Sequence, residues 1–160
     1  MRVTRPGLSR RLHRMVNPAV RVVLRSRAHR LLSGSVALLT VTGRRTGTAY
    51  SFPVQYVRSG RVVIVVPGGH ENKTWWRNVG TSAPVRILIA GGDHAAMAQA
   101  LVGEDQPEEV ADALVAYVAR FRSSRVLGGL RPDRDGRLDR DRLLAAARRA
   151  VVVRILLDRR

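Results

Sequence analysis

Between residues 36 and 102, short β-rich segments follow one another and are separated by turns that contain glycine. Each run is shorter than a typical helix and rich in β-branched residues, which favours strands. Few helical stretches accompany them, so the sequence predicts five or six strands in a small antiparallel barrel or sheet, a mostly β fold with flanking helices (α+β). The expected strands cover residues 36–41, 48–57, 61–66, 85–90, 95–102 and 151–157.

The second half of the chain also carries helix signals. A proline followed by two glutamates begins a helix predicted over residues 107–121, and an aspartate opens another over 139–149. A short helix is expected to end at Asn78, and Pro53 marks an edge strand or a bulge. No strand leads through a GxGxxG turn into a crossover helix, which argues against a Rossmann fold.

The net charge of +17 is concentrated in the first part of the chain. Residues 1–70 contain 13 arginines and no acidic residue, and the first acid is Glu71. A basic segment of this kind can bind nucleic acid, an anionic membrane surface or an acidic cofactor. Lys73 is the only lysine in the chain, and this arginine bias also fits an origin in codon composition.

Residues 1–34 are predicted to form a basic amphipathic helical segment that precedes a main domain over residues 35–160. Over residues 18–32, apolar side chains recur at helical spacing and arginines lie between them. The favoured interpretation is a helix packed on the main domain with its arginines in solvent. The alternative is a helix that lies on an anionic membrane surface.

Composition excludes several classes of chemistry. The chain has no cysteine, so disulfides and thiolate catalysis are excluded, and its four histidines do not have the spacing of metal ligands. No apolar run reaches the length of about 18 residues that a membrane span needs, and no signal peptide is evident. We therefore expect a cytoplasmic protein. The basic N-terminal segment also allows an alternative, in which the protein attaches to the inner face of the cell membrane. No residue is assigned as catalytic.

Four short segments in a fixed order indicate a ligand site: residues 42–47 (TGRRTG), Pro53, 67–69 (PGG) and 75–78 (WWRN). Two adjacent arginines make a strong anion site, because guanidinium groups match phosphate oxygens in pairs. Glycines let the backbone approach a ligand closely, and tryptophans offer flat apolar area. Such a set suits a flat cofactor that carries phosphate. The two tryptophans are adjacent on a short helix, so one of them is expected to be a core residue.

These segments resemble the deazaflavin (F420)-dependent nitroreductases and F420H2-dependent quinone reductases. The stretch 38–47 (LLTVTGRRTG) is similar to the signature strand and turn of that family, and its lead-in over 29–40 agrees. The spacing to the later segments and residues 78–85 (NVGTSAPV) agree as well, so the resemblance covers roughly residues 29–102. It implies a split β-barrel of the FMN-binding-like type that uses coenzyme F420.

The resemblance also implies a role for each segment. Residues 44–46 would meet the phosphate and acidic tail of the coenzyme, and residues 50–53 would lie along the deazaflavin and its ribityl chain. The backbone of residues 66–69 would bond the polar edge of the ring, and residues 75–78 would close over the ring or the phosphate end. The implied cofactor residues are Arg44, Arg45, Thr46, Tyr50, Ser51, Phe52, Pro53, Val66, Pro67, Gly68, Gly69, Trp75, Trp76 and Asn78.

The implied reaction is hydride transfer from reduced F420 to a quinone, an enone or a nitro compound. Tyr50, Tyr56 and His70 are candidate proton donors, with no preference among them. The chain has Asn72-Lys73 where many relatives have Asn-Pro, and it lacks tyrosines at residues 120–124, which weighs against nitro reduction.

Three alternatives remain at this stage: a split barrel that binds FMN, FAD or haem, a basic nucleic-acid-binding protein, and a membrane-surface module without catalysis. Nucleic acid is the less favoured partner, because aromatic residues make up only 4% and no nucleic-acid-binding motif is present. The chain could act as a monomer or as a homodimer.

Overall fold

The computed structural model describes residues 34–121, 130 and 132–159. The expected N-terminal segment and the helix over residues 18–32 therefore lie outside the described residues, except for residue 34, and the domain boundary stays a prediction. The described part contains seven strands, two α-helices and one short 3₁₀-helix. In chain order these are β1 (Val36–Thr42), β2 (Ala49–Gln55), β3 (Val57–Ser59), β4 (Val62–Val65), η2 (Trp75–Val79), β5 (Ala83–Ile89), β6 (Gly92–Val102), α3 (Pro107–Arg120), α4 (Arg140–Arg148) and β7 (Val151–Leu157).

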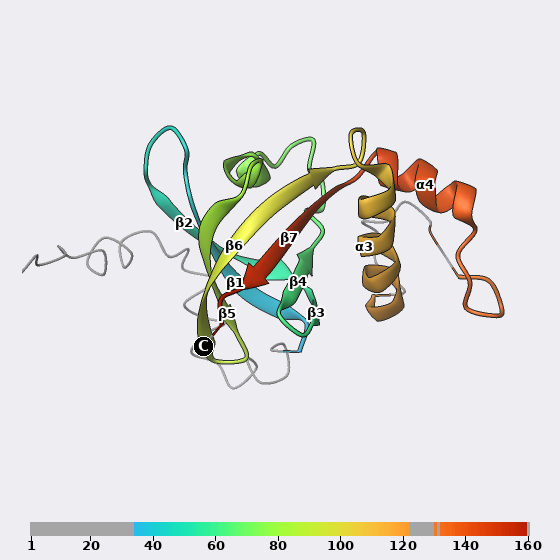
Figure 1. The fold of residues 1–160 in the computed structure, drawn as a ribbon, viewed down its shortest axis with the longest axis horizontal. Helices are drawn as coiled ribbons and strands as arrows, with labels where there is room; N and C mark the ends of the chain where they lie inside the picture. Colours follow the sequence, from blue (N-terminus) through green and yellow to red (C-terminus); the bar gives the residue numbers. More distant parts are fainter. Residues whose placement is uncertain (1–33, 122–129, 131, 160) are drawn as a thin grey trace, which may run out of the picture.

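All seven strands belong to one antiparallel sheet with the order β2-β1-β5-β6-β7-β4-β3 (Figure 1). The two edge strands, β2 and β3, are consecutive in the chain and are joined by Tyr56 alone. A single residue cannot span a flat sheet of seven strands, so the sheet must curl until its edges meet at this corner. The Tyr56 amide donates to the Ser35 carbonyl oxygen at 3.0 Å and fixes the corner against the start of β1. The result is a barrel that is split elsewhere along its edges.

The strand expected over residues 48–57 was wrong as a single strand, and the number of strands is seven rather than five or six. The segment pairs with β1 as far as Gln55, turns at Tyr56 and pairs with β4 from Val57 onward. Local sequence carries no signal for this change of partner, because both halves are β-rich. Pro53 does lie on an edge strand, as predicted, so its missing N–H is tolerated.

Two apolar cores fill the protein. One lies inside the curled sheet, where large residues such as Leu39, Ile87 and Ile155 interdigitate with small alanines of β6. The other lies between the outside of the sheet and the two α-helices, and it includes Leu101 and Val152. Because the start of β7 is covered on both faces, its first three residues (151–153) are all buried, whereas the rest of the strand alternates between buried and exposed residues.

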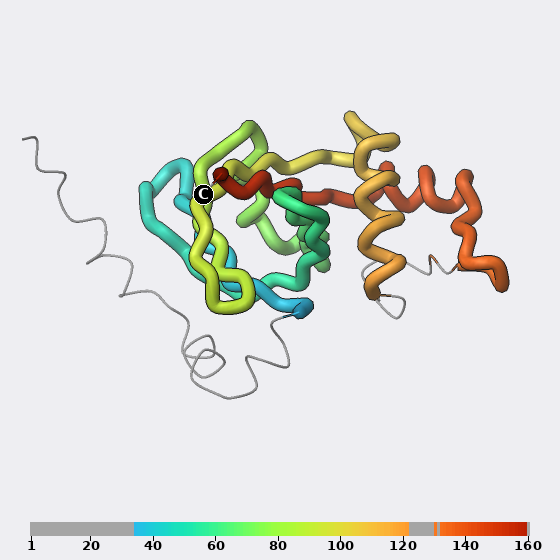
Figure 2. Tube along the Cα trace, turned by 60° about the horizontal axis from the view of Figure 1, so that its bottom comes forward, coloured from blue at the N-terminus to red at the C-terminus, as the bar shows by residue number. Residues whose placement is uncertain are grey.

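The two helices lie beside one another on one side of the barrel, as the tube in Figure 2 shows. Helix α3 begins with Pro107 and packs against β3, β6 and β7. Helix α4 begins after Asp139, whose side chain accepts from the Arg142 amide at 2.8 Å, as the sequence signal for a cap predicted. Among the described residues, no helix is long and apolar enough to span a membrane.

Gly103 joins the end of β6 to the turn before α3, and its lack of a side chain is essential. A Cβ at this position would lie 1.6 Å from the Ala147 carbonyl oxygen, and the Gly103 amide donates to the Ala150 carbonyl oxygen at 2.9 Å. The α4–β7 junction therefore approaches β6 more closely than any other residue type permits.

We expect Gly103→Ala to destabilise the protein by about 3 kcal/mol or more, because the backbone must move to relieve the overlap. Chemical denaturation measures this change. Gly34→Ala is the control, since among the described residues its Cβ would meet only Arg120 Nη2 at 3.8 Å, and it should change stability by less than about 0.5 kcal/mol. Equal stabilities of the two variants would contradict the close approach.

Candidate functional site

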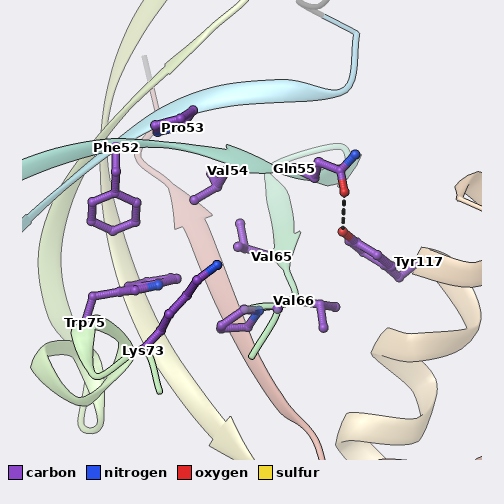
Figure 3. Close-up of a pocket in the computed structure, with 11 residues that line it drawn as sticks. Phe52, Pro53, Val54, Gln55, Val65, Val66, Lys73, Trp75 and Tyr117 are labelled. Carbon is purple, nitrogen blue, oxygen red and sulfur yellow. Dashed lines mark hydrogen bonds between the residues drawn. The ribbon is translucent and has the colours of Figure 1, made fainter. Parts of the chain in front are cut away.

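A pocket of about 430 Å³ lies where the barrel meets α3 (Figure 3). Its walls come from the second half of β2, the end of β4 and the loop that follows, the start of η2 and the segment before it, and the C-terminal half of α3. The lining is mainly apolar with a few polar groups, which is the usual composition of a small-molecule site. The lining residues are Phe52, Pro53, Val54, Gln55, Val65, Val66, Pro67, Gly68, Lys73, Trp75 and Tyr117.

Flat side chains form one wall of the pocket. The Phe52 and Trp75 rings lie 4.9 Å apart between centroids and are tilted by 54°. Trp75 is the first residue of η2, and Phe52 pairs with Leu39 of β1, so both rings are attached to regular structure. Both are only partly buried and pack on the barrel core, which leaves ring surface for a planar ligand.

The α3 end of the pocket is polar. The Tyr117 hydroxyl donates to Gln55 Oε1 at 3.3 Å, and this bond joins the helix to β2 (Figure 3). Tyr117 is only 1% exposed, and burial raises the pKa of its hydroxyl above the ordinary value. The hydroxyl therefore keeps its proton at neutral pH, and in this structure that proton is donated in a hydrogen bond to Gln55 Oε1.

The turn between β1 and β2 is held by backbone and side-chain bonds. The Gly43 amide donates to the Thr48 carbonyl oxygen at 2.8 Å, and Gly47 has a φ of +64°, which favours glycine. A Cβ on Gly43 would lie 2.9 Å from Thr46 Oγ1 and 3.0 Å from Tyr50 Cε2. The two glycines thus let the turn fold tightly around the residues between them.

Asn78 connects this turn to η2. Its Oδ1 accepts from the Arg44 amide at 3.1 Å, and Arg44 Nη1 donates to the Arg77 carbonyl oxygen at 3.2 Å. Arg44 is thereby committed to structure. The neighbouring Arg45 is exposed, and within the described part of the chain its guanidinium has no hydrogen bond or ion pair. Arg45 is therefore the cation of the pair that is available to an anion.

The structure divides the predicted cofactor residues into two groups. Six of them line the pocket: Phe52, Pro53, Val66, Pro67, Gly68 and Trp75. Five others belong to the turn and its link to η2: Arg44, Arg45, Thr46, Tyr50 and Asn78. The remaining three line neither feature: Ser51, Gly69 and Trp76. Their roles in binding a cofactor all stay predictions.

Those three residues have structural contacts. The Ser51 and Thr40 hydroxyls bond each other at 2.8 Å across β2 and β1. Gly69 has a φ of +63° in the loop after β4, and its carbonyl oxygen accepts from two amides there. Trp76 Nε1 donates to the His70 carbonyl oxygen at 3.2 Å. The expectation that one tryptophan would be buried in the core was wrong, since Trp75 and Trp76 are both half-buried.

Five pocket residues were missed: Val54, Gln55, Val65, Lys73 and Tyr117. A signal existed for Tyr117, because it follows Val110 and Leu114 on the apolar face of α3 and brings a hydroxyl to that face. Lys73 carried a compositional signal as the sole lysine. Nothing local distinguishes Gln55 from other polar residues of an edge strand.

The candidate proton donors named from sequence do not line the pocket. Tyr50 lies at the turn, where its hydroxyl is 3.4 Å from Thr46 Oγ1, and His70 Nε2 lies 4.0 Å from Glu71 Oε1. Tyr56 is buried at the barrel corner, and burial raises its pKa, although Arg58 and Arg120 oppose the shift. The described residues contain no group of histidine or acidic side chains that could hold a metal ion.

We expect Tyr117 to ionise at a higher pH than the tyrosines of the denatured protein. Its folded-state pKa is raised, so the stability it contributes is present below the unfolded pKa of about 10 and is lost as the pH rises through the folded value. Ultraviolet titration of wild type and Tyr117→Phe isolates this group by difference. A difference curve centred at or below the midpoint of the denatured protein would contradict burial of the hydroxyl.

Several solved structures are similar to this chain, and one of them reaches a TM-score of 0.50. A candidate 5-nitroimidazole antibiotic resistance protein from Bacteroides thetaiotaomicron is 13% identical, with a TM-score of 0.50 over 82% of this chain and 77% of that one. A FAD and haem binding protein from Mycobacterium smegmatis is 13% identical, with a TM-score of 0.41 over 82% of this chain and 66% of that one. A protein described as F420 reductase is 11% identical, with a TM-score of 0.40 over 82% of this chain and 93% of that one. The first of these supports the split-barrel fold.

The sequence model of the F420H(2)-dependent quinone reductase family matches residues 12–126. This segment includes the turn at residues 43–47, η2, the loop after β4 and all of α3, so every wall of the pocket lies within the match. The resemblance inferred from the ordered motifs is confirmed. The chain belongs to the F420H(2)-dependent quinone reductase family, whose members are oxidoreductases that use coenzyme F420.

Proposed function

We propose that the pocket between β2, β4 and α3 holds the deazaflavin ring of F420 together with a quinone-type acceptor, and that the turn at residues 43–47 holds the coenzyme's phosphate and acidic tail. One observation carries this proposal: six residues expected to meet the ring converge on a single pocket, although they come from three separate segments of the chain. Bound F420H2 supplies a hydride, and the protein's task is to position two planar molecules and exclude water.

The pocket fits the ring in shape and chemistry. Its volume of about 430 Å³ lies in the range of small-molecule sites, and the Phe52 and Trp75 rings provide a flat wall. On another wall, Gly68 offers backbone without a side chain, beside the buried Val66 and Pro67. The backbone amide of Gly68 can donate to a carbonyl oxygen at the ring edge, because the absence of a side chain lets the ring approach the backbone closely.

The turn supports the anionic part of the coenzyme. Arg45 is exposed and uncommitted within the described structure, while Arg44 fastens the turn to η2. Asn78 connects the turn to η2, because its side chain accepts a hydrogen bond from the Arg44 amide. We therefore assign phosphate binding to Arg45 and a positioning role to Arg44 and Asn78. The excess of arginine over residues 1–70 would add attraction for the acidic tail, and an anionic membrane surface is the other partner that this charge could serve.

Tyr117 and Gln55 provide a polar end for the acceptor. Reduction of a quinone carbonyl by hydride also requires a proton at an oxygen. The neutral Tyr117 hydroxyl can donate to that oxygen when its single proton turns from Gln55 Oε1 to the acceptor. The Gln55 amide holds the hydroxyl in place through the 3.3 Å bond. Other walls of the pocket are largely apolar, which suits the carbon skeleton of a quinone.

We expect the wild-type protein to bind oxidised F420 and Arg45→Glu to bind it at least about tenfold more weakly, because a phosphate contact becomes a repulsion. Fluorescence titration of F420 measures both affinities. Arg148→Glu is the control of equal charge change, since Arg148 is exposed on α4 and outside the site. FMN, FAD and haem are titrated in parallel, and tight binding of one of these without F420 binding would overturn the cofactor assignment.

Tyr117→Phe should lower kcat/KM for a quinone by roughly threefold to tenfold, because the variant loses one neutral hydrogen bond to the acceptor oxygen and this is the rate factor that such a bond contributes. Its F420 affinity should equal that of the wild type, because the hydroxyl lies at the acceptor end of the pocket. Steady-state kinetics with F420H2 and a soluble quinone provides the comparison. An unchanged kcat/KM would remove the assigned role from Tyr117.

A further inference from the structure

Among the residues that the structure describes, Lys73 is the only charged side chain that lines the pocket. It comes from the loop between β4 and η2, where its amide donates to the Gly69 carbonyl oxygen at 3.0 Å. Figure 3 shows its side chain extending into the pocket toward Val65, with Trp75 on one side. The backbone bond fixes where this flexible side chain starts, and from there the side chain lines the pocket.

No described carboxylate neutralises this cation. The salt bridges of the described chain do not include Lys73, and the acidic residue nearest in sequence, Glu71, faces His70 at 4.0 Å. Across the pocket lie Val65 and Val66, which are buried and apolar. An ammonium group beside an apolar wall has a low-dielectric environment on one side, which strengthens its attraction for an anion in the same pocket.

The choice of lysine is itself informative. The other 28 of the 29 basic residues are arginine, so this chain has a lysine only at the pocket. An ammonium is a compact point charge on a flexible stem, whereas a guanidinium is a broad planar fork. A compact charge can sit at the edge of a flat ligand without covering the ring face that must remain open to a second molecule.

We propose that Lys73 makes the pocket selective for a planar aromatic ligand that carries negative charge on one edge, and that its ammonium group pairs with this charge. The inference rests on the proposed function and extends it by assigning a charge subsite within the same pocket. Two sources share this chemistry: the reduced deazaflavin ring, which is acidic, and the oxyanion that forms when a quinone accepts a hydride. In both cases a flat ring that has gained electrons carries negative charge, and the Lys73 ammonium group beside it would offset that charge.

The test uses lawsone, a hydroxynaphthoquinone that is anionic at neutral pH, and its O-methyl ether, which is neutral and nearly the same shape. Calorimetric titration of the protein without cofactor gives both dissociation constants. We expect wild type to prefer lawsone by about fivefold, a modest ratio because Lys73 is exposed to solvent at one end. Lys73→Met should abolish the preference, and Lys73→Arg should keep most of it.

Arg148→Met, which removes one charge far from the pocket, is the matched control and should behave as wild type. Repeating the titration with saturating F420 separates the two sources: a preference that persists assigns Lys73 to the acceptor, and competition assigns it to the cofactor ring. Lawsone preference that survives in Lys73→Met, or the absence of any binding to wild type, would overturn the proposal. Binding of F420 itself is measured separately, so failure of the cofactor assignment remains distinguishable.

Discussion

The fold depends on the corner at Tyr56, where the chain leaves one edge of the sheet and joins the other. Gln55 still pairs with β1, and Val57 already pairs with β4, so the two edges of a seven-stranded sheet are held together by one residue. Curling the sheet in this way encloses the inner core. It also places β3 against α3, which brings Tyr117 to Gln55 and gives the pocket its polar end. The shape of the site is thus a consequence of how the barrel closes.

The site is built from two parts that one short helix connects. Trp75, at the start of η2, contributes to the pocket wall, and Asn78, within the same helix, accepts from the turn that carries Arg45. A five-residue helix therefore sets the separation between a flat apolar wall and the exposed Arg45 guanidinium. This coupling explains why aromatic residues, an amide and a paired arginine occur in a fixed order along the sequence. A ligand with a planar ring and an anionic tail is the kind of molecule that needs both parts at once.

Features that depend on local sequence could be predicted. The β-rich runs, the start of α3 at Pro107 and the Asp139 cap are all encoded by neighbouring residues, and the structure confirms them. Features that depend on tertiary pairing could not. The change of strand partner at Tyr56 has no local signal, and neither does the approach of Tyr117 to a residue 62 positions away. The resemblance to a known family predicted the residues that form the flat wall of the pocket. Lys73 stands out in the sequence as the only lysine, but its place in the pocket follows only from the fold.

A crystal structure of the protein with oxidised F420 would test the account most directly. We expect density for the deazaflavin between the Phe52–Trp75 wall and the loop at Val66–Gly69, with the phosphate at Arg45 and the open ring face toward Tyr117. A ring located on the outer face of the sheet, or a phosphate held away from the turn at residues 43–47, would contradict it.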